Sequence, residues 1–107
     1  MEIKGIKVVS ERIDGLDMKT LRNIADRLKS RLKKGVVVLA SVYNGKAFYV
    51  ASVTKDCTDR IKAGEILKKL TDGRAGGRDD MAQGGTKDTA HVNEALSSVP
   101  ELLKSML

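Results

Sequence analysis

Two β-rich runs joined by Asn44-Gly45 constrain the fold of this 107-residue chain more than any other feature of its sequence. Val36–Val42 and Lys46–Val53 are short and rich in β-branched residues, which is typical of strands. Asn and Gly both tolerate the positive φ angles of a type I′ turn, so this dipeptide between two such runs predicts a hairpin. The near-continuous apolar run Val36–Ala40 also indicates a central strand that is covered on both faces.

A strand and a helix are predicted before the hairpin. Rough alternation of apolar and polar residues over Ile3–Val9 indicates the strand. Asp17 is a suitable helix N-cap because its carboxylate can accept from the free N–H groups of the first turn. Apolar residues then follow at helical spacing as far as Leu32, and Lys33-Lys34-Gly35 is typical of a helix end.

Two further helices are predicted after the hairpin. The first begins at Thr58 or Asp59 and ends near Leu70. The second carries an apolar stripe over Val92–Met106, which Pro100 either kinks or divides. The elements then follow in the order β-α-β-β-α-loop-α. We therefore expect one α/β (α+β) domain, with a sheet of three or more strands packed by helices.

Length and composition favour a single globular domain over residues 1–107 and exclude several other classes of protein. The longest apolar run has five residues, whereas a membrane-spanning helix needs about 20. The amino terminus also lacks the apolar stretch of a signal peptide. One cysteine, Cys57, excludes an internal disulfide, and with one histidine, His91, no multi-ligand zinc site is expected. We expect no metal, no cofactor, no membrane contact and a cytoplasmic location.

The charge distribution favours a polyanionic partner. The net charge is +6, and residues 1–34 hold ten basic and five acidic side chains, a net charge of +5. A basic surface of this kind is typical of nucleic-acid binding, although a plain solvated surface is the alternative. The three aromatic residues, Tyr43, Phe48 and Tyr49, give no row of stacking platforms, so we expect recognition of a folded or duplex nucleic acid by backbone and shape. The predicted diffuse phosphate contacts are Lys19, Arg22, Lys29 and Lys33.

No catalytic set is predicted. His91 has no nucleophile in a recognisable motif, and we expect it to be exposed on the polar side of the last helix. Asp79-Asp80 lacks the further carboxylates or histidines that a metal-dependent hydrolase requires. Gly76-Gly77 is not followed by the Gly-Lys-Ser/Thr of a phosphate-binding loop.

The segment Gly73–Gly85 holds five of the ten glycines and is predicted as a loop. Paired glycines allow the main chain to approach a partner closely, and successive N–H groups can form an anion-binding concavity. Arg74 and Arg78 flank the first glycine pair, and Gln83 can donate to and accept from a base edge or a ribose. The segment is therefore a candidate nucleic-acid contact loop, with a flexible linker as the alternative.

The motifs of residues 35–107 resemble the C-terminal domain of bacterial alanyl-tRNA synthetase. The resemblance rests on Val53-Thr54-Lys55-Asp56, on Thr58–Glu65, and on Gly76-Gly77-Arg78-Asp79-Asp80-Met81-Ala82-Gln83-Gly84-Gly85. This domain belongs to a DHHA1-like family that is also appended to DHH phosphoesterases, where a histidine usually stands in place of Arg78. The synthetase branch often has proline in place of Asp79 and one more small residue before the last glycines.

The resemblance implies a non-catalytic tRNA-binding domain, excised from the C-terminus of a larger alanine–tRNA ligase. In the family, this domain contacts the outer corner (elbow) of tRNA and helps one alanine tRNA serve both the aminoacylation and the editing domains of the same chain. The implied contacts are Gly76, Gly77, Arg78, Met81, Gln83, Gly84 and Gly85, with Arg74 beside them.

Two other functions remain open at this point. One is an accessory nucleic-acid-binding domain of a DHH-type phosphoesterase. The other is a dimerisation module, with a homodimer formed through the stripe Val92–Met106. If the glycine segment is an exposed contact loop, Gly77→Val and Arg78→Ala should both weaken tRNA binding with little effect on the melting temperature.

Overall fold

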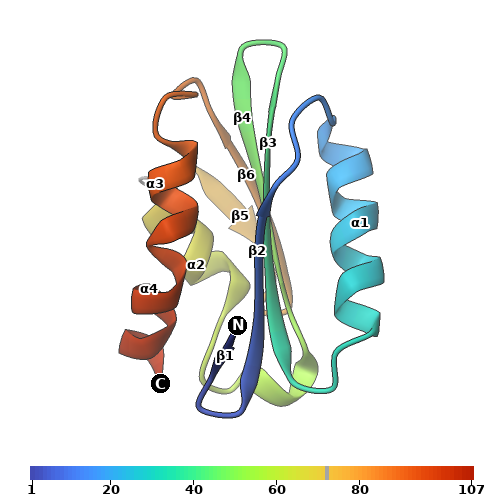
Figure 1. The fold of residues 1–107 in the computed structure, drawn as a ribbon, viewed down its shortest axis with the longest axis vertical. Coiled ribbons are helices and arrows are strands. Elements are labelled where there is room, and N and C mark those ends of the chain that lie inside the picture. Colours follow the sequence, from blue (N-terminus) through green and yellow to red (C-terminus); the bar gives the residue numbers. More distant parts are fainter. Residues whose placement is uncertain (72) are drawn as a thin grey trace.

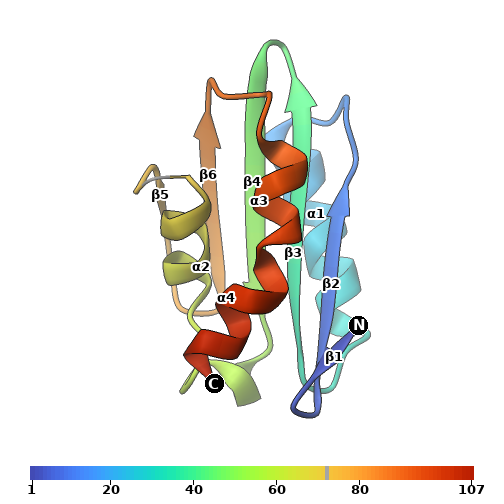
Figure 2. The ribbon, with the colours of Figure 1, turned by 60° about the vertical axis from the view of Figure 1, so that its left-hand side comes forward.

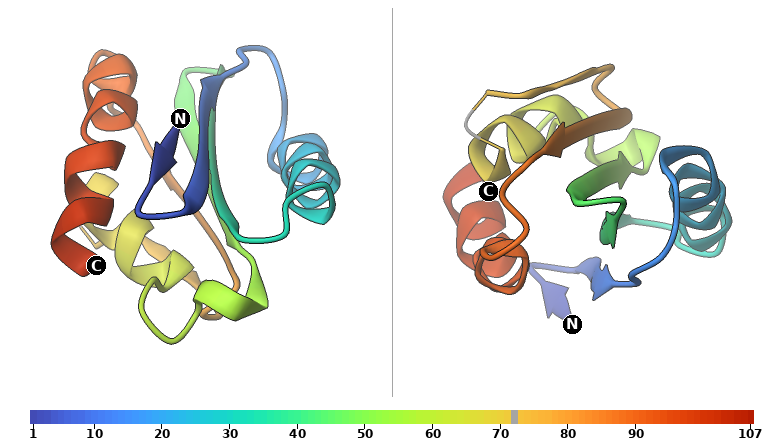
Figure 3. Two further views of the ribbon diagram at one scale, coloured as in Figure 1. Left: turned by 60° about the horizontal axis from the view of Figure 1, so that its bottom comes forward. Right: turned by 90° about the horizontal axis from the view of Figure 1, so that it is seen from above.

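A six-stranded mixed sheet lies between helices on both of its faces in the computed structural model, which describes residues 1–71 and 73–107 (Figure 1). Helix α1 covers one face, and α2, α3 and α4 cover the other (Figure 3). The strands are β1 (Glu2–Ile3), β2 (Ile6–Arg12), β3 (Gly35–Tyr43), β4 (Lys46–Val53), β5 (Ala75–Gly77) and β6 (Met81–Thr86). The helices are α1 (Met18–Ser30), the 3-10 helix η1 (Lys55–Cys57), α2 (Ala63–Leu70), α3 (Val92–Ser97) and α4 (Val99–Met106).

The strand order is β1-β2-β3-β4-β6-β5 (Figure 2). Strands β2 and β3 are parallel and are connected through α1, whereas all other neighbours are antiparallel. This arrangement confirms the predicted single α+β domain with helices against one sheet. Among the described residues, no helix combines the length and the apolar character needed to cross a bilayer.

The central hairpin is confirmed. Asn44 and Gly45 have φ angles of 52° and 73°, and Tyr43 pairs with Lys46 on either side of them. Positive φ at both central residues is the signature of the type I′ turn, which matches the twist of the flanking strands. The predicted burial of Val36–Ala40 is also confirmed, because every residue of this run is fully buried.

Each face of the sheet has its own apolar core. On the α1 face, Leu21 and Ala25 pack against Val37, Leu39 and Val50. On the other face, α2, α3 and α4 bury a larger cluster that includes Tyr49. The apolar residues of Val92–Met106 belong to this second cluster, so the chain's own sheet covers the stripe that motivated the dimerisation hypothesis. Pro100 stands in the first turn of α4, where its missing N–H costs little, and the tail is therefore two helices.

Helix α1 begins as predicted and ends earlier. The Asp17 carboxylate accepts from the Thr20 N–H at 2.9 Å, which confirms the N-cap. The helix ends at Ser30, so the prediction that Lys33-Lys34-Gly35 closes it was wrong. Gly35 instead begins β3, where a Cβ atom would lie 2.5 Å from a Leu32 side-chain carbon and 2.9 Å from the Lys7 carbonyl oxygen. Glycine is present here for close packing, because the helix has already ended.

Two other predicted boundaries were wrong. Lys4 and Gly5 have φ angles of 50° and 83°, so the predicted strand Ile3–Val9 is instead a small hairpin of β1 and β2. The second helix begins at Ala63 because the Thr58 hydroxyl donates to the Lys55 carbonyl and does not cap a helix. The 3-10 helix η1 and an irregular turn precede α2.

The glycine segment, predicted as a loop, is a β-hairpin. Strand β6 pairs with β4 along Met81–Thr86, and β5 pairs with β6 at the edge of the sheet. The Arg78 N–H donates to the Met81 carbonyl at 2.7 Å beside the hairpin turn. The physical reason is that β4 is buried on both faces, so its second edge must find backbone hydrogen-bond partners. Backbone pairing outweighs the weak strand preference of glycine here.

Alternate residues of the hairpin face opposite sides of the sheet. Ala82 and Gly84 lie across from Ala51 and Tyr49 on the α2 face, and Gly77 pairs with Ala82 on that face. A Cβ atom on Gly77, whose φ is 149°, would lie 2.5 Å from the Met81 carbonyl oxygen. The expectation that Gly77→Val leaves the fold undisturbed was therefore wrong. Gly76, in contrast, has no atom within 4 Å of an added Cβ.

The hairpin generates a matched pair of stability predictions. Gly77→Ala should lower the free energy of unfolding by about 1–3 kcal/mol, because the side chain meets backbone atoms at a φ that L-residues rarely adopt. Gly76→Ala should change it by less than about 0.5 kcal/mol, as expected of an open surface position. Urea unfolding of both variants measures the difference. Equal losses in the two would contradict this account of the hairpin.

Candidate nucleic-acid interface

An open groove of about 660 Å³ lies on the α1 face, where the β5–β6 hairpin extends beyond the helix. Helix α1 packs on β3 and β4 and leaves this face of the hairpin uncovered. We call this hollow the glycine groove. Its lining residues are Arg22 from α1 and Gly76, Gly77, Arg78, Met81, Ala82 and Gln83 from the hairpin.

Six of the twelve predicted contact residues meet in this groove. Arg22 and Arg78 come from elements far apart in the sequence, and they line it together with the two glycines and Gln83. Ala82 also belongs to the lining of the groove, although its side chain is buried on the α2 face and nothing in the sequence marked it as a contact residue. Of the other predicted residues, Gly84 faces the opposite side of the sheet, Gly85 lies beside Phe48, and Lys19 and Lys33 do not line the groove.

The Asp80 carboxylate ties the hairpin to α1. It lies 3.6 Å from the Arg78 Nε and 3.7 Å from the Lys29 Nζ, so one carboxylate serves two cations. The Asp80 carbonyl also accepts from the Val53 N–H at 2.9 Å. Lys29, a predicted phosphate contact, does not line the groove and is instead paired with Asp80 at the hairpin turn.

Asp79 ties the same turn to the opposite layer. Its carboxylate accepts from the Lys62 Nζ at 3.1 Å, and its carbonyl accepts from the Ala63 N–H at 2.8 Å. The acid pair thus has a structural use that the sequence did not reveal. The described residues contain no group of three or more His, Cys, Asp or Glu side chains that could hold a metal ion.

The electrostatics of the groove leave Arg78 available to a ligand. Its side chain is 81% exposed, and exposed ion pairs contribute only about 0–1 kcal/mol. A phosphate group can therefore displace the Asp80 carboxylate at small cost and gain the bidentate geometry of a guanidinium. The glycine floor offers no side chain to obstruct the approach.

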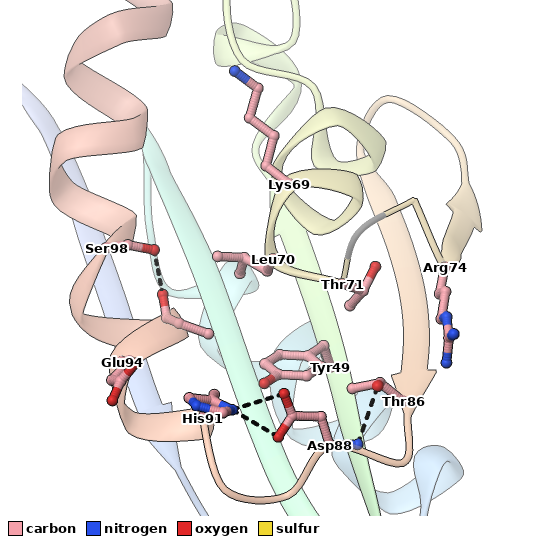
Figure 4. A pocket seen from close by; sticks show the side chains of 11 residues that line it. Tyr49, Lys69, Leu70, Thr71, Arg74, Thr86, Asp88, His91, Glu94 and Ser98 are labelled. Carbon is pink, nitrogen blue, oxygen red and sulfur yellow. Dashed lines mark hydrogen bonds and ion pairs between the residues drawn. The ribbon is translucent and has the colours of Figure 1, made fainter.

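A second hollow of about 640 Å³ lies on the other face of the hairpin, between α2 and α3 (Figure 4). We call it the Tyr49 cleft. Arg74, another predicted contact residue, precedes β5 and lines this cleft, so it lies on the opposite side of the hairpin from the glycine groove. The other lining residues are Tyr49, Lys69, Leu70, Thr71, Thr86, Asp88, His91, Glu94, Ala95 and Ser98.

His91 forms an exposed ion pair at the rim of the Tyr49 cleft. Its Nδ1 lies 2.8 and 2.9 Å from the two Asp88 carboxylate oxygens, and its side chain is 63% exposed, as predicted (Figure 4). The hydrogen bond to Asp88 raises the pKa of His91, and the same bond lowers the pKa of Asp88.

This ion pair predicts a pH window of stabilisation. The contribution of His91 is full below the ordinary histidine pKa of about 6.5 and is lost as pH rises through its raised pKa. The contribution of Asp88 is full above the ordinary pKa of about 3.9 and is lost as pH falls through its lowered pKa. The stability difference between wild type and Asp88→Asn should therefore be greatest between about pH 4 and 6.5.

The titration itself is directly measurable, because His91 is the one histidine of the chain. Its proton NMR signals should titrate above the ordinary pKa in the wild type and move back towards that value in Asp88→Asn. An unchanged His91 pKa in that variant would show that the ion pair does not persist in solution.

Comparison with known proteins identifies the family of this chain. Residues 5–105 match the DHHA1 domain family. The chain is 44% identical over 102 residues to the alanine–tRNA ligase of Aromatoleum aromaticum, covering 92% of this chain and 12% of that protein. It is 46% identical over 104 residues to the alanine–tRNA ligase of Anaeromyxobacter dehalogenans, covering 94% and 11%. The chain thus spans about one-eighth of the length of these curated relatives.

The fold is also that of a solved structure. The crystal structure of the C-Ala domain from Aquifex aeolicus alanyl-tRNA synthetase matches with a TM-score of 0.83 and 31% identity, covering 96% of this chain and 98% of that one. The resemblance seen in the sequence is confirmed by these matches. On family match, identity and fold together, the chain belongs to the DHHA1 domain family, in the form that alanine–tRNA ligases carry.

Proposed function

We propose that this domain binds tRNA without catalysis, as the C-terminal domain of an alanine–tRNA ligase, and that the glycine groove is its contact site. The observation that carries the proposal is the meeting of Arg22 and Arg78 over a floor that contains Gly76. Two guanidinium groups from different layers can hold neighbouring phosphates, and the bare backbone allows the RNA to approach closely.

The rigidity of the hairpin supports recognition of a folded RNA. Backbone hydrogen bonds from Val53 and Ala63 to the carbonyls of Asp80 and Asp79 hold the turn, so the groove is formed before any ligand arrives. A preformed, aromatic-poor surface suits a fixed arrangement of phosphates and riboses better than a flexible single strand. The outer corner of tRNA, where two loops meet, offers such an arrangement.

The proposal also assigns this domain a role beside the other domains of a longer alanine–tRNA ligase. In it, the domain holds alanine tRNA in the cytoplasm while the acceptor end reaches the aminoacylation and editing domains of the same chain. Lys19, Lys29 and Lys33 add a diffuse positive field along the α1 side. The relatives, which are much longer alanine–tRNA ligases, support this arrangement.

The two competing functions have less support. The phosphoesterase reading expects a histidine where Arg78 stands, and the curated relatives described above are ligases. The dimerisation reading rested on Val92–Met106, whose apolar residues pack within this chain.

Salt-dependent binding tests the groove. Arg78→Ala and Arg22→Ala should each weaken tRNA binding about three- to tenfold, because each loses a phosphate contact. Each should also reduce the slope of log affinity against log salt by about 0.7–0.9. Filter binding or fluorescence anisotropy at several salt concentrations measures both quantities, and nuclease footprinting locates the contact on the tRNA.

Arg27→Ala is the matched control, because Arg27 is an exposed arginine of the same helix that does not line the groove. It should change affinity by less than the other two variants, and all three should keep the wild-type melting temperature. If Arg78→Ala and Arg27→Ala behave alike, the groove is not the contact site. A footprint outside the tRNA corner would overturn the elbow contact alone.

A further inference from the structure

The Tyr49 cleft contains a tyrosine whose ring is buried and whose hydroxyl opens into the cleft. Tyr49 is 2% exposed and its ring belongs to the larger apolar core. No hydrogen bond between described residues reaches its hydroxyl, which Figure 4 shows turned towards the α3 side of the cleft. Because no group of the described residues occupies this hydroxyl, it is free to bind a polar group that enters the cleft.

The chemistry of this hydroxyl is that of a neutral phenol. Burial raises the pKa of Tyr49, and the nearby Asp88 carboxylate acts in the same direction. The hydroxyl therefore keeps its proton at neutral pH and can both donate and accept. This dual capacity suits a ribose hydroxyl or a base edge.

The remaining walls are polar and are of two kinds. Lys69 and Arg74 contribute positive charge from the α2 and β5 side, and Glu94 contributes a carboxylate from α3. None of these three forms an ion pair with another described residue. A ligand with an anionic group at one end and hydrogen-bond donors at the other matches this distribution, and the volume of about 640 Å³ is in the range of small-ligand sites.

The position of the cleft connects it with the glycine groove. The β5–β6 hairpin forms a wall of both hollows, because Arg74 and Thr86 line one and Gly76 and Gln83 line the other. Strand β5 is the last strand of the sheet, with no strand of the described chain beyond it. An RNA strand that crosses this edge can therefore reach both hollows.

We propose that the Tyr49 cleft binds one unpaired nucleotide of the RNA that the glycine groove holds. Arg74 holds its phosphate, and the Tyr49 hydroxyl binds its ribose or base edge. The inference rests on the proposed tRNA-binding function and adds a second, separate contact to it.

Tyr49→Phe is the decisive variant, since it removes only the hydroxyl. The fold loses no hydrogen bond, so the melting temperature should stay the same or rise, while tRNA affinity should fall about three- to tenfold. Tyr43→Phe is the control, because Tyr43 is 39% exposed at the end of β3 and lines neither hollow. It should change neither quantity. A lower melting temperature with unchanged affinity in Tyr49→Phe would make the hydroxyl purely structural and overturn the inference, and so would no change in either quantity.

NMR of the tyrosine rings gives a direct readout. The chain has two tyrosines, so in a Tyr43→Phe background with ring-labelled tyrosine the labelled ring signals belong to Tyr49 alone. Added tRNA should shift these signals, and Arg74→Gln should reduce the shift. The 5′-monophosphates of adenosine, guanosine, cytidine and uridine are then added one at a time. A shift of the Tyr49 signals would show that the cleft binds a nucleotide without an RNA bound in the glycine groove.

The outcomes separate this inference from the proposed function. If tRNA shifts the amides of Gly76 and Gln83 and leaves Tyr49 unmoved, the groove stands and the cleft inference fails. If the wild-type domain binds no tRNA, the proposed function itself fails. If a monophosphate shifts Tyr49 but tRNA does not, the cleft takes a free nucleotide and the RNA assignment is overturned.

Discussion

The second edge of β4 is the constraint on which the rest of this structure depends. Strand β4 is buried on both faces, and β3 satisfies one of its edges through the Asn44-Gly45 hairpin. The other edge requires backbone partners, and the glycine-rich segment supplies them as β6. Order in this segment therefore comes from main-chain hydrogen bonds and does not need side chains. The result is a rigid strand pair with an almost bare surface, which forms a wall of both hollows.

The ion pairs at the hairpin turn have opposing effects on the proposed RNA binding. Asp79 and Asp80 place two negative charges beside a surface that we propose to bind RNA, which by itself opposes binding. In return they fix the turn against α2 through Lys62 and against α1 through Lys29. Exposed pairs of this kind contribute little free energy, and backbone hydrogen bonds from Val53 and Ala63 to the Asp80 and Asp79 carbonyls hold the same turn. A fixed groove gives up less conformational freedom when it binds than a mobile loop does.

The sequence predicted the elements whose signals are local. Asn44-Gly45, the Asp17 cap and the helical stripes depend on residues within a few positions of one another, and the structure confirms them. The strand nature of Gly73–Gly85 was missed because it depends on β4, about 30 residues earlier, and glycine has little strand preference of its own. Because the segment was predicted as a loop, Arg74 and Gly76 could not be assigned to opposite faces of the sheet from the sequence. The structural use of Asp79 likewise depends on Lys62, which only the folded chain brings near.

Strand alternation also explains why the glycines of this hairpin come in pairs. In Gly76-Gly77, the second residue lies on the α2 face, where a Cβ would meet the Met81 carbonyl oxygen at 2.5 Å, while the first is open. In Gly84-Gly85, the first would meet the Arg74 carbonyl oxygen at 2.7 Å, while the second makes only ordinary contacts of 3.6 Å. Each pair thus contains one glycine that the fold requires and one that it does not. The two that the fold does not require, Gly76 and Gly85, both lie on the α1 face, where Gly76 lines the groove and Gly85 lies beside Phe48. Since packing does not demand glycine at these two positions, the open backbone at Gly76 supports the proposed approach of RNA on that face.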